Sequence, residues 1–177
     1  LNKTLRKQGF FVFKREYVIL QIKIYMKKIS VLGAGLVGKA IAADLCDTYQ
    51  VTSYDYDQKG LSFLKEKHSV AAVQLDLSDK SNIELAVKDA DIVVNALPGF
   101  MGFESTKRII EAGKDVVDIS FFPEDPFILD SFAKEKGVIA ITDCGVAPGM
   151  GNVICGYHNE RMKMSDYKCF VGGLPFK

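Results

Sequence analysis

The sequence predicts an α/β fold, a doubly wound parallel sheet of the Rossmann type. Three observations predict it. Residues 30–42 contain an apolar run, three glycines in the order G-x-G-x-x-G (Gly33, Gly35 and Gly38), and then a helical pattern. An acidic residue, Asp55, follows the next strand-like segment, 22 residues after Gly33. Short apolar segments then alternate with helical patterns along most of the remaining chain, which is typical of parallel strands joined by helical crossovers.

The glycine segment is the predicted phosphate site. If a strand ends at Leu32 and a helix begins after the second glycine, Gly33 allows the sharp turn and Gly35 lets a pyrophosphate approach the backbone. Gly38 then lets the helix pack closely on the strand. The anion binds to free backbone N–H groups at the positive end of the helix. Glycines also mark many turns that bind nothing, so the interpretation depends on the rest of the chain.

Asp55 is the residue that predicts the choice of cofactor. A carboxylate at this place accepts hydrogen bonds from the adenosine ribose and opposes a 2′-phosphate. Two like charges in contact near a surface repel by up to about 4 kcal/mol at an effective dielectric constant of about 20. The sequence therefore predicts NAD in preference to NADP. Asp57 is a second candidate for the ribose, and the alternative role for either acid is to cap the following helix.

The order of the elements follows from the periodicity of the apolar residues and from the turn residues between them. Ser81 and Glu84 have the spacing of a capping box, and Asp125 followed by Pro126 is a favourable helix start. Strands are predicted to run through residues 30–32, 51–54, 71–75, 91–96, 115–120 and 138–142. Helices are predicted at 36–45, 58–67, 81–87 and 104–112, and between Asp125 and Gly137.

Two segments near strand ends are further candidates for ligand contacts. Asp76 and Leu77 follow the third strand, and strand ends on one edge of such a sheet line the ligand crevice. Asp76 is therefore predicted to meet the adenine and Leu77 to pack on its ring, with a turn or cap as the alternative for Asp76. Residues 143–150 (DCGVAPGM) leave the last strand and enter a helix predicted at 150–162, whose first amides are candidates for holding a substrate carboxylate or part of the nicotinamide. A final strand is predicted at 167–171.

Composition places the chain among ordinary globular proteins. It has 177 residues, of which 48% are hydrophobic and 25% charged, with a net charge of +1. Residues 1–25 hold six basic residues against one acid, so residues 26–177 carry a net charge of −4, which gives no reason to expect nucleic acid as a partner.

The first 25 residues are predicted to be a leader outside the fold, with Met26 as the natural start. Their apolar run is too short to span a membrane, and no cleavage site follows it. The alternative is a basic arm that touches a membrane surface or RNA through its interleaved aromatic residues. These aromatic residues are Phe10, Phe11, Phe13 and Tyr17.

The cysteines and histidines indicate neither a metal site nor a disulfide framework. Cys46, Cys144, Cys155 and Cys169 form no C-x-x-C pair and have no cluster of histidines beside them. Reduced thiols and a cytoplasmic location are therefore expected. His68, in a charged run, is predicted to be a surface residue, and His158 is predicted to be structural.

Several motifs together resemble the saccharopine dehydrogenase family, which includes the related lysine 6-dehydrogenases. They are VLGAGLVG, YDYD, VVNALPG, VVDIS, DCGVAPGM and VGGLP, and the resemblance covers residues 26–177. It implies a nicotinamide-dependent oxidoreductase acting at the C–N bond of a lysine-derived amino acid. It also implies a Rossmann domain at 26–148, and at 149–177 the beginning of a truncated α+β domain that completes the substrate site and a homodimer interface.

The resemblance also implies roles for individual residues. The cofactor residues are Gly33, Gly35, Leu36, Val37 and Gly38 at the pyrophosphate, Asp55 at the ribose, Asp76 and Leu77 near the adenine, and Asn95, Ala96 and Pro98 toward the nicotinamide. The substrate candidates are Asp118 and Ser120 in VVDIS, Phe121 directly after it, and Gly145 and Val146 in DCGVAPGM. Ala147 stands where saccharopine reductases tend to have Asp, so the sequence is more similar to a lysine 6-dehydrogenase, which oxidises a free amine to an imine. A general base is required but is not identified.

The sequence also bears on two other classes of function. A nucleotide-sensing Rossmann protein without turnover is the alternative, because such folds also serve as regulatory domains. The DCGVAPGM to VGGLP segment argues against it, since a sensor would not need this segment. A short-chain dehydrogenase requires the spacing Y-x-x-x-K, and none of the seven tyrosines provides it.

Overall fold

A computed structural model describes residues 26–172 of the chain. Its centre is a six-stranded sheet in the order β3-β2-β1-β4-β5-β6, and each neighbouring pair is parallel. This is the order of a doubly wound sheet and confirms the predicted fold class. The strands are β1 (Lys28–Leu32), β2 (Gln50–Asp55), β3 (Ala71–Gln74), β4 (Ile92–Asn95), β5 (Asp115–Asp118) and β6 (Ala140–Ile141).

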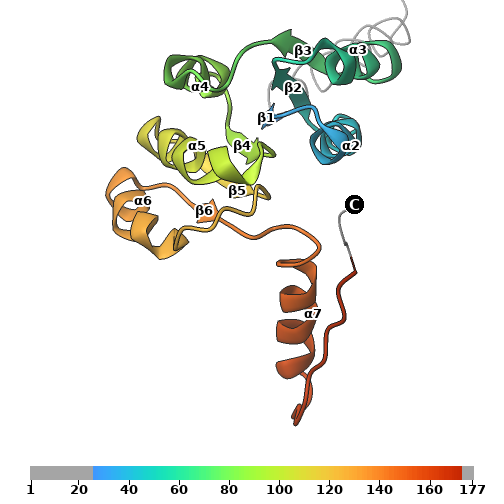
Figure 1. The fold of residues 1–177 in the computed structure, drawn as a ribbon, viewed down its shortest axis with the longest axis vertical. Helices are drawn as coiled ribbons and strands as arrows, with labels where there is room; N and C mark the ends of the chain where they lie inside the picture. The colour runs from blue at the N-terminus through green and yellow to red at the C-terminus, as the bar shows by residue number, and fades with distance from the viewer. Residues whose placement is uncertain (1–25, 173–177) are drawn as a thin grey trace, which may run out of the picture.

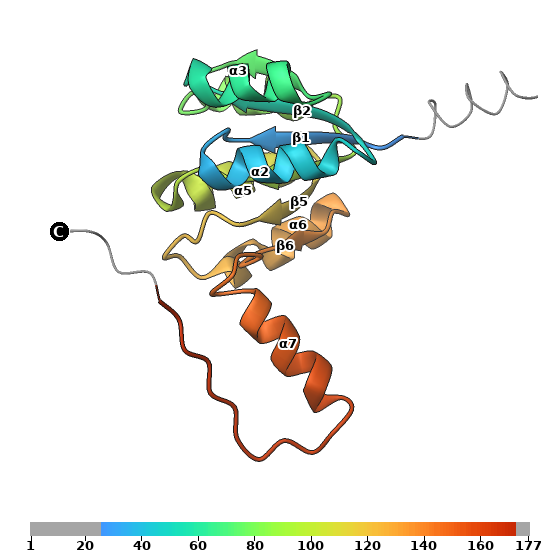
Figure 2. The same cartoon turned by 90° about the vertical axis from the view of Figure 1, so that its right-hand side faces the viewer.

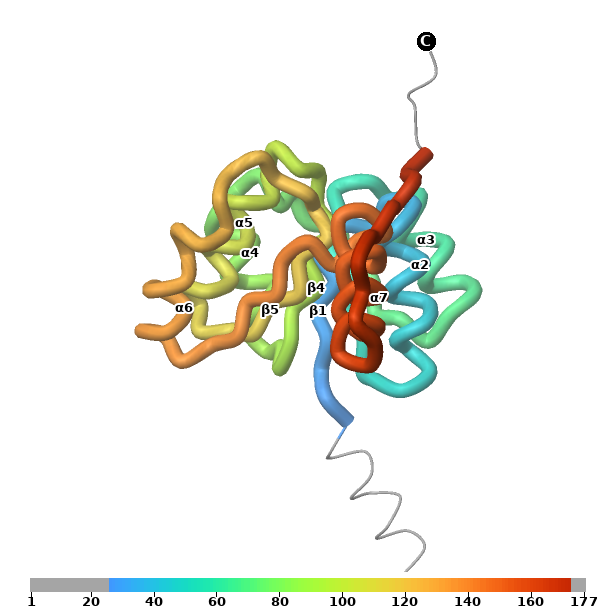
Figure 3. Tube along the Cα trace, turned by 90° about the horizontal axis from the view of Figure 1, so that it is seen from below, coloured from blue at the N-terminus to red at the C-terminus, as the bar shows by residue number. Residues whose placement is uncertain are grey.

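Helices cover both faces of the sheet. Seen from below, α2 and α3 lie on one side of the strands, and α4, α5 and α6 lie on the other (Figure 3). A further helix, α7, extends away from the sheet (Figure 1). The helices are α2 (Leu36–Leu45), α3 (Gln58–Lys67), α4 (Lys80–Val87), α5 (Gly99–Glu111), α6 (Asp130–Lys136) and α7 (Met150–Asn159), and a 3-10 turn, η1 (Pro126–Leu129), precedes α6.

The register brings the carboxyl ends of the strands to one edge. Leu32, near the end of β1, is paired with Tyr54 on β2 and with Asn95 on β4. Asn95 is in turn paired with Asp118 at the end of β5. Segments that follow different strands and lie far apart in sequence therefore meet along this edge.

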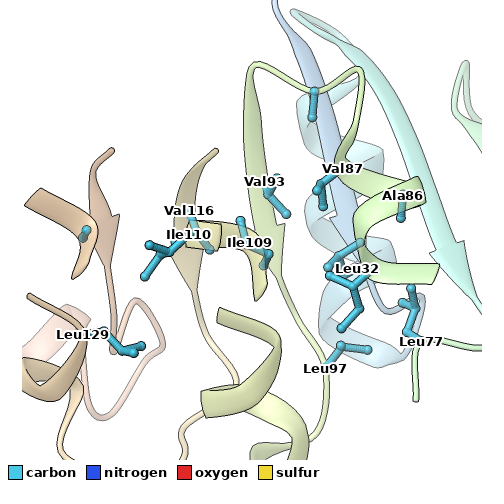
Figure 4. Close-up of a cluster of buried hydrophobic side chains, with 13 residues drawn as sticks. Leu32, Leu77, Ala86, Val87, Val93, Leu97, Ile109, Ile110, Val116 and Leu129 are labelled. Atoms are coloured by element: carbon cyan, nitrogen blue, oxygen red, sulfur yellow. The ribbon is translucent and has the colours of Figure 1, made fainter. Parts of the chain in front are cut away.

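The two faces of the sheet have separate apolar cores, because successive side chains of a strand point to opposite faces. On β1, Ile29 and Val31 pack toward α2 and α3, whereas Leu32 packs toward α4 and α5. The cluster on the side of α4 and α5, called the second cluster below, is shown in Figure 4. The buried residues of the first cluster are Ile29, Val31, Ala34, Ala42, Val51, Leu61, Leu64, Val70, Ala72 and Val94. Those of the second are Leu32, Leu77, Ile83, Ala86, Val87, Ala90, Val93, Leu97, Ile109, Ile110, Val116, Leu129 and Ala133.

Two helix starts differ from the sequence predictions. α5 begins at Gly99, five residues before the predicted start at Glu104. α4 is capped by Asp79, whose carboxylate accepts a hydrogen bond from the backbone N–H of Ser81 at 2.9 Å, so the predicted capping box on Ser81 is wrong. The predicted cap at Asp125 is confirmed: its side chain accepts from the N–H of Phe127 at 2.9 Å, and Pro126 follows.

The C-terminal part of the described chain forms one helix and no strand. α7 ends at Asn159 rather than at Met162, and residues 167–171 form neither a helix nor a strand, so the predicted final strand is wrong. This segment runs beside α7 (Figure 2), where the hydroxyl of Tyr167 donates to the carbonyl oxygen of Gly151 at 2.8 Å. The predicted leader, residues 1–25, and the last residues of the VGGLP motif lie outside the described residues.

Candidate functional site

A cavity of about 940 Å³ lies along the carboxyl edge of the sheet. Segments that follow five strands line it in spatial order, from β3 through β2, β1 and β4 to β5. This is the place where ligands bind in open α/β sheets. The predicted site residues that line it are Gly33, Gly35, Leu36, Val37, Gly38, Asp55, Asp76, Leu77, Ala96, Pro98 and Ser120.

The glycine turn joins β1 to α2 in a conformation that requires its residues. Gly33 has a φ of +99°, and its N–H donates to the carbonyl oxygen of Tyr54 at 2.8 Å. A Cβ at Gly33 would lie 2.7 Å from the carbonyl oxygen of Ala96. At Gly38, a Cβ would overlap the carbonyl oxygen of Gly33, because the first turn of α2 packs directly on the turn. Both glycines are therefore needed for the turn itself.

Gly35 is different, because its α-carbon faces the cavity. A Cβ at this position would have no heavy atom within 4 Å, and Gly35 lines the cavity. Gly35 is also the N-terminal cap residue of α2, and no side chain caps this helix end. The first backbone N–H groups of α2 are thus open to an anion at the positive end of the helix dipole. The space beside Gly35 fits a pyrophosphate.

Carboxylates gather at the β2–β3 end of the cavity. Asp55 accepts hydrogen bonds from the backbone N–H of Ala34 at 2.5 Å and from that of Asp57 at 2.8 Å, so it ties the glycine turn to the end of β2. Asp57 caps α3 by accepting from the N–H of Lys59 at 3.1 Å. Asp76 accepts from the hydroxyl of Ser78 at 2.7 Å and from its N–H at 2.9 Å, and these bonds hold the pKa of Asp76 below its ordinary value.

These three acids make this end of the cavity negative. Asp55, Asp57 and Asp76 all line the cavity, and its lining contains no Lys or Arg. A ribose with free hydroxyl groups is a hydrogen-bond donor to such carboxylates, whereas a 2′-phosphate would be repelled by them.

A buried polar cluster lies beneath the opposite end of the cavity. The side-chain amide of Asn95 donates to Asp118 Oδ2 at 2.6 Å and to Ser105 Oγ at 2.8 Å. The hydroxyl of Thr106 also donates to Asp118 Oδ2, at 2.9 Å. Asn95 and Asp118 are 0% and 1% exposed, and neither lines the cavity. Burial raises the pKa of Asp118 above its ordinary value, against the opposing effect of the hydrogen bonds from Ser120, Thr106 and Asn95.

The remaining substrate candidates are separated. Ser120 lines the cavity, while Phe121, with a φ of +53°, is exposed and does not. Gly145 and Val146 follow β6 and are also outside the lining, although the backbone N–H of Cys144 donates to the carbonyl oxygen of Asp118 at 3.0 Å and so holds their loop beside β5.

Sequence reasoning missed several residues of the cavity. Phe100 and Met101 line the β4 end because α5 starts earlier than predicted, and no residue pattern indicated this start. Tyr56 lies between the predicted candidates Asp55 and Asp57, and this position was the signal in the sequence that could have indicated its place in the cavity. The other missed lining residues are Ala34, Ser78, Leu97 and Ile119.

Residues 26–172 contain neither a candidate metal cluster nor a candidate membrane-spanning helix. Within this range, no group of three or more His, Cys, Asp or Glu side chains is placed to hold a metal ion. None of the helices in the same range has the length and apolar character needed to cross a membrane.

Known proteins similar to this chain include a saccharopine dehydrogenase and an α-aminoadipic semialdehyde synthase. A saccharopine dehydrogenase from Saccharomyces cerevisiae described as NADP(+)-dependent and L-glutamate-forming is 24% identical over 156 residues, which are 84% of this chain and 35% of that protein. An α-aminoadipic semialdehyde synthase from Arabidopsis thaliana is 28% identical over 111 residues, 60% of this chain and 10% of that protein. The chain thus spans about a third or less of the length of these relatives.

Solved structures show the same fold. The apo saccharopine dehydrogenase (L-Glu forming) from Saccharomyces cerevisiae superposes with a TM-score of 0.67 at 22% identity, over 76% of this chain and 31% of that one. The 3-ketoreductase KijD10 from Actinomadura kijaniata, in complex with NADP, gives a TM-score of 0.53 at 16% identity, over 74% of this chain and 42% of that one.

The match to a family model covers most of the sheet and its helices. Residues 29–141 match the family described as "Saccharopine dehydrogenase NADP binding domain", whose first matched residue lies in β1 and whose last lies in β6. These residues include the glycine turn, the three acids at the β2–β3 end and Ser120. The chain belongs to the saccharopine dehydrogenase family, and residues 29–141 are its nicotinamide-cofactor-binding domain.

Proposed function

We propose that this chain is the NAD-binding part of an oxidoreductase that acts at the C–N bond of a lysine-derived amino acid. The observation that carries the cofactor assignment is the negative β2–β3 end of the cavity, where three carboxylates and no cation line the wall. The family supports the reaction class, because its relatives carry the names of saccharopine dehydrogenases. The preference for NAD is proposed against the family description, which names NADP.

Different residues of the cavity hold different parts of the cofactor. The open N–H groups at the start of α2 bind the pyrophosphate, and the space beside Gly35 admits it. Asp55 holds the glycine turn in place and accepts hydrogen bonds from the ribose. At the other end, Leu97, Phe100 and Met101 form an apolar wall that keeps water from the reacting carbon. When bound, NAD supplies the carbon that accepts the hydride.

The proposed substrate is the free amine of lysine rather than saccharopine. Ala147 stands where saccharopine reductases tend to have a carboxylate, and its loop is held beside the end of β5 by the bond from the Cys144 N–H to Asp118. We expect the protein that carries this chain to reduce NAD with L-lysine and to be inactive with saccharopine. Steady-state assays that follow the absorbance of NADH measure the rate of NAD reduction with each substrate. Activity with saccharopine alone would contradict the substrate, and binding of NAD without turnover on lysine, saccharopine or other diamines would favour a nucleotide sensor.

The cofactor preference is tested by binding alone. We expect NAD to bind at least about tenfold more tightly than NADP, because the 2′-phosphate would face three carboxylates. Asp55→Asn should reduce the ratio of the affinity for NAD to the affinity for NADP. Isothermal titration calorimetry of both cofactors measures it.

Asp57→Asn is the matched control for this test. Asparagine caps helices about as well as aspartate, so the start of α3 is retained while one carboxylate of the cavity is removed. The ratio should change more with Asp55→Asn than with Asp57→Asn. Tighter binding of NADP than of NAD by the unmodified protein would remove Asp55 from the proposed role.

A further inference from the structure

We infer that Ser120 Oγ is a dedicated hydrogen-bond acceptor in the cavity and that its partner is the carboxamide N–H of the nicotinamide. The inference rests on the proposed function and assigns the nicotinamide end of the site to a named atom. Ser120 lines the cavity two residues after β5 ends, at the end opposite Asp55 and Asp76.

The direction of the Ser120 hydroxyl follows from its neighbour. Ser120 Oγ lies 2.8 Å from Asp118 Oδ1 and 2.9 Å from Asp118 Oδ2. An ionised carboxylate only accepts hydrogen bonds, so the single hydroxyl hydrogen of Ser120 is donated to Asp118. The lone pairs of Ser120 Oγ are then left to face the cavity. A ligand atom that bonds to Ser120 must carry the hydrogen itself.

Hydrogen-bond donors hold both oxygens of the Asp118 carboxylate in place. Asn95 and Thr106 donate to Oδ2, at 2.6 and 2.9 Å, and the backbone N–H of Ser120 donates to Oδ1 at 2.9 Å. Because Asp118 is 1% exposed, water does not compete for these bonds. The arrangement matches an ionised acceptor, and both hydrogen-bond contacts of the Ser120 hydroxyl within the described residues are with Asp118.

The start of α5 fixes the position of the Ser120 side chain. A Cβ at Gly102 would overlap Ser120 Oγ, so the helix backbone lies directly against this hydroxyl. At Gly99, a Cβ would lie 2.9 Å from the carbonyl oxygen of Ser120. Ser120 is thus packed between Asp118 and the first turns of α5, and its acceptor is preorganised for a ligand.

The topology indicates which part of the cofactor reaches Ser120. The glycine turn follows β1, in the middle of the row of strand ends, and the acids follow β2 and β3 on one side of it. With the pyrophosphate at the glycine turn and the adenosine beside the acids, the nicotinamide half lies over the ends of β4 and β5. The carboxamide NH₂ is the hydrogen-bond donor on the nicotinamide ring, and the hydroxyl groups of the attached ribose are the other donors of that half.

The test compares two cofactors that differ in this donor. In 3-acetylpyridine adenine dinucleotide a methyl group replaces the NH₂ of the carboxamide, and the rest of the molecule is unchanged. We expect the unmodified protein to bind NAD roughly threefold to tenfold more tightly than the analogue, as for one hydrogen bond. In Ser120→Ala, the affinity for NAD should fall by the same factor, and the affinity for the analogue should not change. Isothermal titration calorimetry measures all four dissociation constants.

Ser78→Ala is the matched control. Ser78 also lines the cavity and also donates its hydroxyl to an aspartate two residues earlier, Asp76, but at the adenosine end. It should change the affinities for NAD and for the analogue by equal factors. Thermal melting of both variants confirms that they fold.

The outcomes separate this inference from the function on which it rests. If the unmodified protein binds neither dinucleotide, the proposed function fails. If NAD binds but Ser120→Ala weakens both dinucleotides equally, or neither of them, only the inference on Ser120 is overturned. If Ser120→Ala weakens lysine binding to the NAD complex without changing NAD affinity, the partner is the substrate ammonium and the assignment to the carboxamide is overturned.

Discussion

Replacing Gly35 with alanine is expected to weaken NAD binding at least about tenfold. The free energy of unfolding should change by less than about 0.5 kcal/mol. The φ of Gly35 is −65°, which alanine adopts readily, and a methyl group there would have no heavy atom within 4 Å apart from those of its chain neighbours. It would instead occupy the cavity beside the open amides of α2, where the pyrophosphate is proposed to bind.

Two measurements on the same variant check this expectation. Calorimetric titration gives the affinity for NAD, and urea unfolding gives the stability. A loss of both would mean that Gly35 supports the turn rather than the ligand. An unchanged affinity would place the pyrophosphate away from the start of α2.

The outline of the fold was predictable because its signals are local. The apolar segments and the turn residues between them set the alternation of strands and helices, and Asp125 with Pro126 marked a helix start that the structure confirms. The start of α5 was not predictable in this way. Gly99 and Gly102 disfavour a helix locally, but a side chain at either place would collide with the segment after β5. This reason becomes visible only when β5 lies beside α5.

The candidate site was predictable to the extent that it follows strand ends. Asp55 ends β2, Asp76 lies two residues after β3 and Ala96 directly follows β4, and all three line the cavity. Asn95 and Asp118 end their strands, yet they point away from the cavity. They are paired in register across β4 and β5, so their side chains project on the same face, toward α5. Which face a strand-end residue takes depends on the pairing, and no single segment contains that information.

The last predicted strand fails for a related reason. Tyr167, Phe170 and Val171 have a composition that favours strands, but extended backbone becomes a strand only beside another strand. Among the described residues this segment lies along α7, where Tyr167 bonds to the backbone of Gly151. Local propensity was therefore insufficient to form a strand without a partner.

Gly38→Ala is expected to destabilise the fold by at least about 2 kcal/mol, in the upper part of the range for overpacked sites. A Cβ at Gly38 would overlap the carbonyl oxygen of Gly33 and would lie 3.2 Å from the Cβ of Ala96. The carbonyl belongs to a turn whose φ of +99° leaves few other arrangements. The clash therefore has to be relieved by moving α2 away from β1, which opens the core around Ala42.

Gly156→Ala provides the matched control, because Gly156 also lies inside a helix, α7, and a Cβ there would have nothing within 4 Å. Alanine is better than glycine in a helix by about 1 kcal/mol, so this variant should be as stable as the unmodified protein or slightly more stable. Urea unfolding followed by circular dichroism compares the two. If Gly38→Ala proved as stable as Gly156→Ala, close packing of α2 on the glycine turn would not be what selects glycine at the third position of the G-x-G-x-x-G pattern. If it unfolds as expected, the three glycines of the pattern have separable roles: Gly33 for the turn, Gly38 for packing, and Gly35 for the ligand.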